Sequence, residues 1–311
     1  MGSGGSRIAL AVLAVALVAA GTAGCGLGAG QGTGEVSLQV TEHFGRLPLA
    51  GVSAAHVPGS ETVMRMLERH FRISTRYGGG FVESIDGHSG TSDGVDWFYY
   101  VNGTEAAAGA ATTAVHRGDH VWWDLHDWRA AESVPAVVGS FPEPFADGLG
   151  GRRYRTVVEC AAVQSVCRRV VAALRGAGAR VTQVALGARA PAGTLRVLVG
   201  AWQALRRDRA AARIARGPAA SGVYARFAGA GGGELELLDP RGVVARTLGA
   251  GAGLIAATAG PSGLPEWVVS GTGPAGVAAA AGALNPADLH DAFAVAVSAR
   301  RTVALPLEPA L

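Results

Sequence analysis

The first third of the chain alternates apolar and polar residues in short runs, with one helical interval among them. Residues 36–41 (VSLQVT) alternate as a half-buried strand does. Ser60 is placed to cap a helix with apolar residues on one face, namely Val63, Leu67 and Phe71. The dipeptide Asn102-Gly103 after an aromatic run predicts a two-residue hairpin turn. Further strands are expected at 81–85, 97–101 and 121–125.

Aromatic side chains are concentrated in the strands around residues 97–128. Neighbouring residues on a strand point to opposite sides, so Trp97 and Tyr99 share one face while Tyr100 lies on the other. Trp122 and Trp123 point apart for the same reason. An exposed aromatic face suits a planar ligand or a protein partner; alternatively, a helix or the second half of the chain covers it. The candidate ligand-binding residues are Trp97, Tyr99, Tyr100, Asn102, Trp122, Trp123 and Trp128.

From residue 152 onward, strand-like and helical runs alternate, which is typical of an α/β domain. A stretch rich in proline and glycine, residues 131–151, precedes it without periodicity and is expected to be a linker. The sequence therefore predicts two domains, at 36–130 and 152–311. Strands are expected at 154–159, 179–186, 195–199, 222–228, 233–238, 242–247, 265–270 and 292–298, and helices at 163–175, 202–215 and 275–284.

The N-terminus has the pattern of an export signal. Residues 1–24 combine Arg7, an unbroken apolar run and a small-residue end, and the run is short for a spanning helix. Thr22-Ala23-Gly24-Cys25 resembles the bacterial lipobox, so Cys25 is the expected lipidation site. Cleavage without lipidation and an uncleaved anchor are the alternatives. Residues 25–35 are expected to be a glycine-rich tether. Nine of them, residues 26–34, span about 15–18 Å as a random coil.

Two further cysteines, Cys160 and Cys167, lie seven positions apart. On one continuous helix their Cα atoms would be about 10 Å apart, which is too far for a disulfide. They can pair only if Cys160 lies before the helix begins. In an exported protein we expect a Cys160–Cys167 disulfide, with two free thiols as the alternative.

The amino-acid composition excludes several kinds of binding and catalytic site. All 27 basic residues are arginines, which excludes a phosphate-loop lysine, a Schiff-base lysine and a Ser-Lys dyad. Residues 26–150 carry 7 Arg against 15 Asp and Glu, whereas residues 151–311 carry 19 against 9. The two halves thus have net charges of −8 and +10. The basic half could face anionic lipid, a cell-wall polymer or the acidic half, or be a solvated surface.

Three further patterns carry less information. Gly271, Gly273 and Gly276 form a G-x-G-x-x-G motif at a helix start, a pattern typical of dinucleotide binding. Export would separate the chain from the cytoplasmic nucleotide pool, so a glycine-rich helix start is the preferred interpretation. Histidines and aspartates at 116–127 extend too far along a strand to converge on one metal ion, so no metal site is expected. An arginine run between 202 and 216 could bind phosphate or teichoic acid, or be a solvated helix face. Its members are Arg206, Arg207, Arg209, Arg213 and Arg216.

The order of landmarks in the first domain resembles a known bacterial family. They are the helical TVMRML at 62–67, GFVESIDG at 80–87, WFYYVNG at 97–103, Gly109 and GDHVWW at 118–123. Together they resemble the DUF4430 family, which is similar to the C-terminal β-domain of transcobalamin and intrinsic factor. The resemblance covers about residues 36–128. It implies a β-grasp-like α+β fold and an association with cobalamin or another solute outside the membrane.

One difference from that family concerns the ligand. In transcobalamin-like carriers the β-domain covers one face of the corrin, and a large helical barrel supplies much of the remaining site. The present sequence has no pattern for such a barrel, and the second half resembles no family that we recognise. Cobalamin is therefore a candidate ligand only through the resemblance, and no resident cofactor is expected.

The sequence as a whole predicts an α+β protein, a β-grasp-like, transcobalamin-type domain followed by a separate α/β domain. The expected function is that of a non-catalytic solute-binding lipoprotein on the extracytoplasmic face of the membrane. Its expected partners are the membrane, through the N-terminal lipid, a corrinoid or other small solute and an uptake transporter, but not nucleic acid. The alternative is a cell-envelope lipoprotein that binds other proteins and has no small-molecule ligand.

Overall fold

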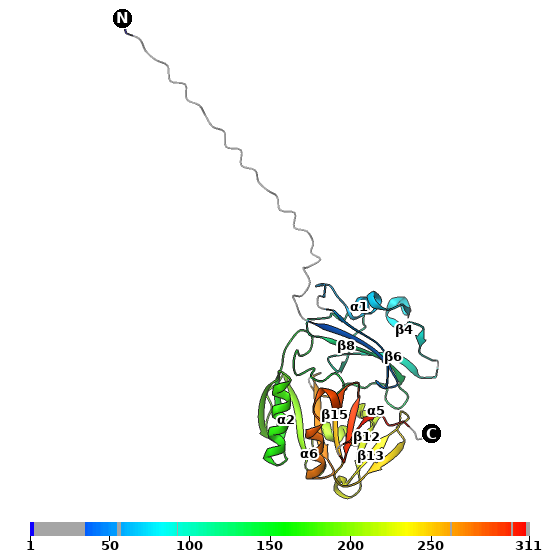
Figure 1. The fold of residues 1–311 in the computed structure, drawn as a ribbon, viewed down its shortest axis with the longest axis vertical. Coiled ribbons are helices and arrows are strands. Elements are labelled where there is room, and N and C mark those ends of the chain that lie inside the picture. Colours follow the sequence, from blue (N-terminus) through cyan, green and yellow to red (C-terminus); the bar gives the residue numbers. More distant parts are fainter. Residues whose placement is uncertain (3–34, 55–56, 92, 262, 300, 309–311) are drawn as a thin grey trace.

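The computed structural model describes residues 1–2, 35–54, 57–91, 93–261, 263–299 and 301–308. Residues 3–24 of the expected signal segment, Cys25 and most of the tether lie outside these residues. In Figure 1 an N-terminal part (residues 35–130) lies against a C-terminal part (residues 152–308). Both parts mix strands with fewer helices, so the predicted α+β class is confirmed at this level.

The N-terminal part is built on a five-stranded sheet of order β2-β1-β8-β6-β7. The central pair, β1 and β8, is parallel, and the other neighbours are antiparallel. The alternation of apolar and polar residues in the sequence matches this sheet, because alternate residues of β1 are buried while most of their neighbours are partly exposed. The predicted hairpin is present, since Val101 pairs with Thr104 across Asn102-Gly103. The strands are β1 (Val36–Glu42), β2 (Leu47–Ala54), β6 (Val95–Val101), β7 (Thr104–Glu105) and β8 (His120–Asp127).

One face of this sheet is covered by helix α1 (Val63–His70) and a small three-stranded sheet. The helix cap is Thr62, whose Oγ1 accepts a hydrogen bond from the Arg65 amide at 3.2 Å. The expectation of a Ser60 cap is therefore wrong by two residues. The buried side of α1 closes the core of the N-terminal part. The small sheet consists of β3 (Ile73–Arg76), β4 (Phe81–Ile85) and β5 (His88–Ser89), with a 3-10 turn η1 (Tyr77–Gly79).

The C-terminal part is built on a seven-stranded sheet of order β10-β9-β11-β16-β15-β17-β18. The first four strands are mutually parallel and the last three are added antiparallel. The central strands are buried along their whole length, so they form apolar runs without alternation. The strands are β9 (Arg155–Cys160), β10 (Arg180–Ala185), β11 (Thr194–Ala201), β15 (Gly253–Ala259), β16 (Pro265–Gly271), β17 (Ala294–Ser298) and β18 (Arg301–Leu305).

Both faces of this sheet are covered. Trp267 and Val269 point to the face that carries α2 (Gln164–Gly176) and α6 (Pro274–Gly282). Val268 points to the opposite face, which packs against short helices and a second small sheet. These elements are α3 (Trp202–Leu205), α4 (Arg209–Ala215), α5 (Pro218–Ser221), β12 (Ala225–Ala228), η2 (Ala230–Gly232), β13 (Glu234–Leu238) and β14 (Val244–Leu248), and the last helix is α7 (Pro286–Leu289).

Several predicted elements differ from the structure. The helix expected over 202–215 is two helices, because Asp208 turns inward and caps α4 by accepting a hydrogen bond from the Ala210 amide. Strands β2, β15 and β18 have no counterpart in the sequence prediction. In the ranges that the structure describes, no helix is both long and apolar enough to cross a membrane.

The connecting segment, residues 131–151, is a packed structure. Val134 and Val137 are buried in the core shared by the two parts, and Phe141 and Phe145 are buried against Trp267. The proline- and glycine-rich composition that predicts a linker here corresponds to turns that insert apolar side chains between both parts. This packing fixes how the N-terminal part is joined to the C-terminal part.

The predicted disulfide is present between Cys160 and Cys167, with Cα atoms 6.1 Å apart. Cys160 is the last residue of β9, and Cys167 lies in the first turns of α2. The strand-to-helix turn brings the two Cα atoms within bonding range, as the spacing argument requires.

Candidate functional site

The predicted aromatic set divides between the two faces of the N-terminal sheet. On the α1 side, Tyr99 stacks on Trp123 with ring centroids 4.9 Å apart, and Trp97 donates an Nε1–H hydrogen bond to the His88 carbonyl at 3.1 Å. Trp97 and Trp123 are buried, and Tyr99 is half-buried. The three line a cavity of about 190 Å³, which is smaller than typical ligand pockets. These side chains form the local core.

Tyr100 and Trp122 lie on the opposite face, fully buried between the two parts. Their rings contact Phe293 edge-on, at centroid distances of 5.5 Å and 5.4 Å. Phe44 joins them, with its ring 5.1 Å from those of both Phe293 and Tyr224. We call this set the aromatic joint. The face considered as a ligand platform is thus covered by the second half of the chain, the alternative that the sequence left open.

A polar centre lies inside the aromatic joint. The buried Asp124 carboxylate accepts hydrogen bonds from the Phe44 amide at 3.0 Å, the Gly45 amide at 2.8 Å and the Thr41 hydroxyl. It also lies 2.8 Å from Nδ1 of His126. These bonds fix the turn between β1 and β2, and this turn carries Phe44 into the C-terminal part. The sequence did not predict this role for Asp124.

Three aromatic rings surround the His126 imidazole within the same centre. Phe98 stacks on it at a centroid distance of 4.5 Å, and Phe44 lies 4.7 Å away. Phe293 meets it edge-on at 5.2 Å. Among the residues that the structure describes, no group of three or more His, Cys, Asp or Glu side chains is arranged to hold a metal ion.

Asn102 and Trp128, the other two predicted ligand-binding residues, have structural contacts. The Asn102 side-chain amide donates to Asp119 Oδ1 at 2.8 Å and to the Gly148 carbonyl at 2.7 Å, and its Oδ1 accepts from the His120 amide. Asn102 has a φ of 52°, as the hairpin turn requires. It therefore ties the hairpin to the connecting segment. Trp128 is half-buried and donates through Nε1 to Asp96.

His120 lies at the edge of the joint and is held neutral. Its ring nitrogens lie 3.0 Å from the Ser140 hydroxyl and 3.1 Å from Gln39 Oε1. Burial, with a smaller contribution from His290, lowers the pKa of His120 to about 4. Gln39 in turn donates to Asp291 in the C-terminal part. These contacts extend the joint from its aromatic interior to its polar rim.

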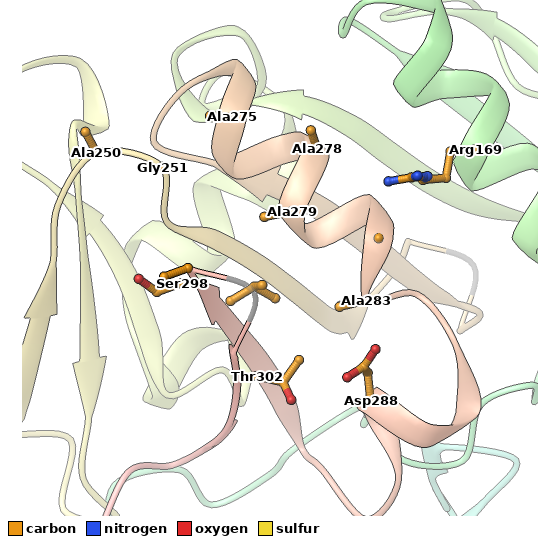
Figure 2. Close-up of a pocket in the computed structure, with 13 residues that line it drawn as sticks. Arg169, Ala250, Gly251, Ala275, Ala278, Ala279, Ala283, Asp288, Ser298 and Thr302 are labelled. Atoms are coloured by element: carbon orange, nitrogen blue, oxygen red, sulfur yellow. The ribbon is translucent and has the colours of Figure 1, made fainter.

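An open groove of about 720 Å³ lies along α6 (Figure 2). Its walls are mostly alanine and glycine from α6 and from the β14–β15 loop, and Val297 and Thr302 contribute from the β17–β18 hairpin. In Figure 2 Arg169 reaches from α2 towards α6, while Asp288 and Thr302 lie near Ala283. The volume lies within the range of small-molecule sites, which combine apolar walls with a few polar groups.

Glycine packing sets the position of α6 beside this groove. A Cβ on Gly276 would lie 2.0 Å from the Ala252 carbonyl oxygen, and one on Gly271 would lie 2.4 Å from the Gly276 carbonyl carbon. The G-x-G-x-x-G motif thus allows α6 to lie directly on β15 and β16. The preferred interpretation of the motif, a glycine-rich helix start, agrees with this packing. The groove itself has no sequence signal, because alanine is common throughout the chain.

A second pocket, about 400 Å³, surrounds Arg196. The guanidinium of Arg196 lies 2.5 Å from Glu159, 2.5 Å from Asp208 and 3.4 Å from Glu266. Hydrogen bonding to Glu159 raises the pKa of Arg196 above its ordinary value, and burial raises the pKa of Glu266. One cation is thus shared by three carboxylates, an arrangement that cross-links β9, β11 and β16 with the start of α4.

Comparisons with known proteins give a family for one segment. No curated protein matches the chain. Among solved structures, it is similar to haptocorrin in complex with Cbi, at 15% identity and a TM-score of 0.25, over 30% of this chain and 26% of haptocorrin. It is also similar to a proposed metal-binding protein from Ruminococcus gnavus ATCC 29149, at 14% identity and a TM-score of 0.24, over 30% of this chain and 97% of that one.

The chain therefore spans about a quarter of the length of haptocorrin, and similarity at this level supports no inference about its ligand. The family comparison is more specific. Residues 60–127 match the model described as "Domain of unknown function (DUF4430)". This segment includes α1, β6 and β8, which carry the motifs quoted for the resemblance. The resemblance to the DUF4430 family, predicted over about residues 36–128, is thus confirmed by a match to residues 60–127.

Proposed function

We propose that the chain is a lipid-anchored, non-catalytic binding protein of the extracytoplasmic face, which holds a small solute in the groove along α6. The observation that carries the proposal is the groove itself, about 720 Å³ with apolar walls, one arginine and one aspartate. The export-like segment 1–24, Cys25 and the Cys160–Cys167 disulfide support the location. The β1–β8 parallel pair, with α1 across one face, supports a β-grasp-like N-terminal domain.

The lining suggests what the solute is like. Ala275, Ala278 and Ala279 of α6 present methyl groups, which favour an apolar body. Arg169 and Asp288 offer one charge of each sign, and no ion pair joins either of them to another described residue. A small apolar molecule with an anionic group is the class that fits. An uptake transporter that receives the solute is the proposed partner.

The test is a titration of the full-length chain with 8-anilinonaphthalene-1-sulfonate, an apolar anion that fluoresces when it is bound. Ala278→Trp fills the groove, and Ala172→Trp places the same side chain on an exposed position of α2 outside it. We expect one saturable site whose affinity falls at least tenfold in Ala278→Trp and stays within twofold in Ala172→Trp. Equal binding by both variants would contradict a site in the groove.

Cobalamin added as a competitor tests the corrinoid version separately. Displacement of the probe from the native chain but not from Ala278→Trp supports a corrinoid ligand. If cobalamin at high micromolar concentration does not displace the probe, a corrinoid ligand is rejected. The proposal that the groove binds a small solute is not affected by that result.

One observation favours the second candidate function, a cell-envelope protein that binds other proteins and no small molecule. The aromatic surface that the sequence offered to a solute is covered within the chain, since Tyr100 and Trp122 are fully buried against Phe293. If no probe binds the groove, this function is the one that remains.

A further inference from the structure

Five arginines lie along one short stretch of the C-terminal part, around α4. Arg206, Arg207, Arg209 and Arg216 are exposed, and Arg213 is half-buried. In the part of the chain that the structure describes, none of the five forms an ion pair with a carboxylate. By contrast, Arg76, Arg129 and Arg226 all pair with nearby acids. We call the five residues the arginine patch.

The one acid close to the patch in sequence pairs with another arginine. Asp208 is the sole acidic residue between positions 201 and 233. Its Oδ1 lies 3.1 Å from Arg196 and accepts a hydrogen bond from the Ala210 amide at 2.9 Å. Asp208 thus pairs with Arg196 and caps α4, so no acid close in sequence forms an ion pair with the five arginines.

The helix itself has two distinct sides. Ala210, Ala211 and Ile214 are buried in the core that the two parts share. Arg209, Arg213 and Arg216 recur at helical spacing on the other side. A run of like charges this close is self-repelling, and an external polyanion that binds it releases counterions and relieves the repulsion.

The arrangement of the two parts indicates where that polyanion lies. The chain enters the fold at β1, in the N-terminal part, and the C-terminal part lies beyond that sheet (Figure 1). The part nearest the proposed anchor carries a net charge of −8 over residues 26–150, which anionic lipid headgroups would repel. The basic part lies farther along the fold, which favours a polymer outside the membrane over the bilayer surface.

We propose that the arginine patch binds a phosphate-rich anionic polymer of the cell envelope. Guanidinium groups donate paired hydrogen bonds to phosphate oxygens, so a row of them follows a phosphodiester chain. The binding is electrostatic and weakens steeply with salt. Only the biological identity of the polymer rests on the proposed extracytoplasmic location; the interaction itself is independent of the α6 groove and of the lipid.

The test measures binding of the full-length chain, held in neutral phosphatidylcholine vesicles, to poly(glycerol phosphate) and to inorganic polyphosphate over a range of salt concentrations. The patch variant replaces all five arginines by glutamine. A control variant removes the same charge at exposed arginines elsewhere in the C-terminal part, as Arg155→Gln, Arg175→Gln, Arg180→Gln, Arg246→Gln and Arg301→Gln. Unchanged thermal unfolding checks that both variants are folded.

We expect the patch variant to lose at least about tenfold in affinity and to show a shallower salt dependence, while the control loses less than about threefold. Equal losses in both variants would mean that diffuse charge binds the polymer, and would overturn the patch. Binding to vesicles containing phosphatidylglycerol but to neither polymer would assign the patch to the membrane instead. Probe binding in the groove is measured independently, so a failure here leaves the proposed function intact.

Discussion

The two faces of the β6–β8 strand pair use the same kinds of residue for different purposes. On one face Trp97, Tyr99 and Trp123 complete a core with α1, which is close in sequence. On the other, Tyr100 and Trp122 meet Phe293, more than 170 positions later. The difference shows that an aromatic-rich strand does not by itself mark a ligand surface. One face stabilises a domain, and the other joins it to the rest of the chain.

Removing Trp122 is expected to give the largest effect and to separate the two faces most clearly. A fully buried tryptophan replaced by alanine costs about 3–5 kcal/mol. Because Trp122 belongs to the joint, Trp122→Ala should also split one calorimetric unfolding transition into two. Trp123→Ala is the matched variant on the other face and should destabilise the N-terminal part without that separation. A single transition in Trp122→Ala, at the same cost as in Trp123→Ala, would argue against a joint.

Asp124 tests the polar centre of the joint. The Asp124 carboxylate accepts hydrogen bonds from the Phe44 amide, the Gly45 amide and the Thr41 hydroxyl, and Asp124→Asn replaces one of its oxygens by an NH2 group that cannot accept them. We expect this substitution to lower the free energy of unfolding by about 3 kcal/mol. Glu83→Gln, which removes an exposed ion pair with Arg76, should have a much smaller effect on the free energy of unfolding, because solvent screens an exposed pair. Denaturant unfolding measures both. Similar small losses would show that Asp124 does not hold the turn.

The sequence predicted much of the fold for a clear physical reason. Strand β1 alternates between buried and partly exposed residues, and β6 and β8 are aromatic-rich runs next to turn residues, so all three could be found, as could the opposite orientations of Trp122 and Trp123. Strand β15 (GLIAATA) is buried on both faces and has no alternation to detect. Strand β2 contains Pro48 and Gly51, residues typical of turns, and lies at the sheet edge, where they are tolerated.

The site was harder to predict than the fold. Nothing near Tyr100 or Trp122 in sequence indicates that Phe293 and Tyr224 will cover them, because that contact depends on how two separate sheets pack. The α6 groove arises from the absence of side chains, and the alanines that line it resemble those elsewhere. Asp208 interrupts a predicted helix because it faces Arg196, a long-range contact that local periodicity does not contain.

Glu143 links pH to the edge of the joint, in the connecting segment. Burial, with Asp147 and Asp119 nearby, raises the pKa of Glu143 to about 7, from 4.5 in an exposed position. Between pH 4.5 and 7 the folded chain keeps a proton that the unfolded chain has released, so the free energy of unfolding falls as pH rises. Glu143→Gln should reduce this fall by about 3 kcal/mol, measured by denaturant unfolding at several pH values. An unchanged pH slope would contradict this assignment.

The most direct test of the joint is a double-mutant cycle between Trp122 and Phe293, whose rings lie 5.4 Å apart. The free energies of unfolding of Trp122→Leu, Phe293→Leu and the double variant give their coupling. We predict about 0.5–1.5 kcal/mol for this pair, and no coupling for Trp123 with Phe293, since Trp123 lies on the opposite face. Additive costs for Trp122 and Phe293 would mean that the two parts do not meet through the aromatic joint.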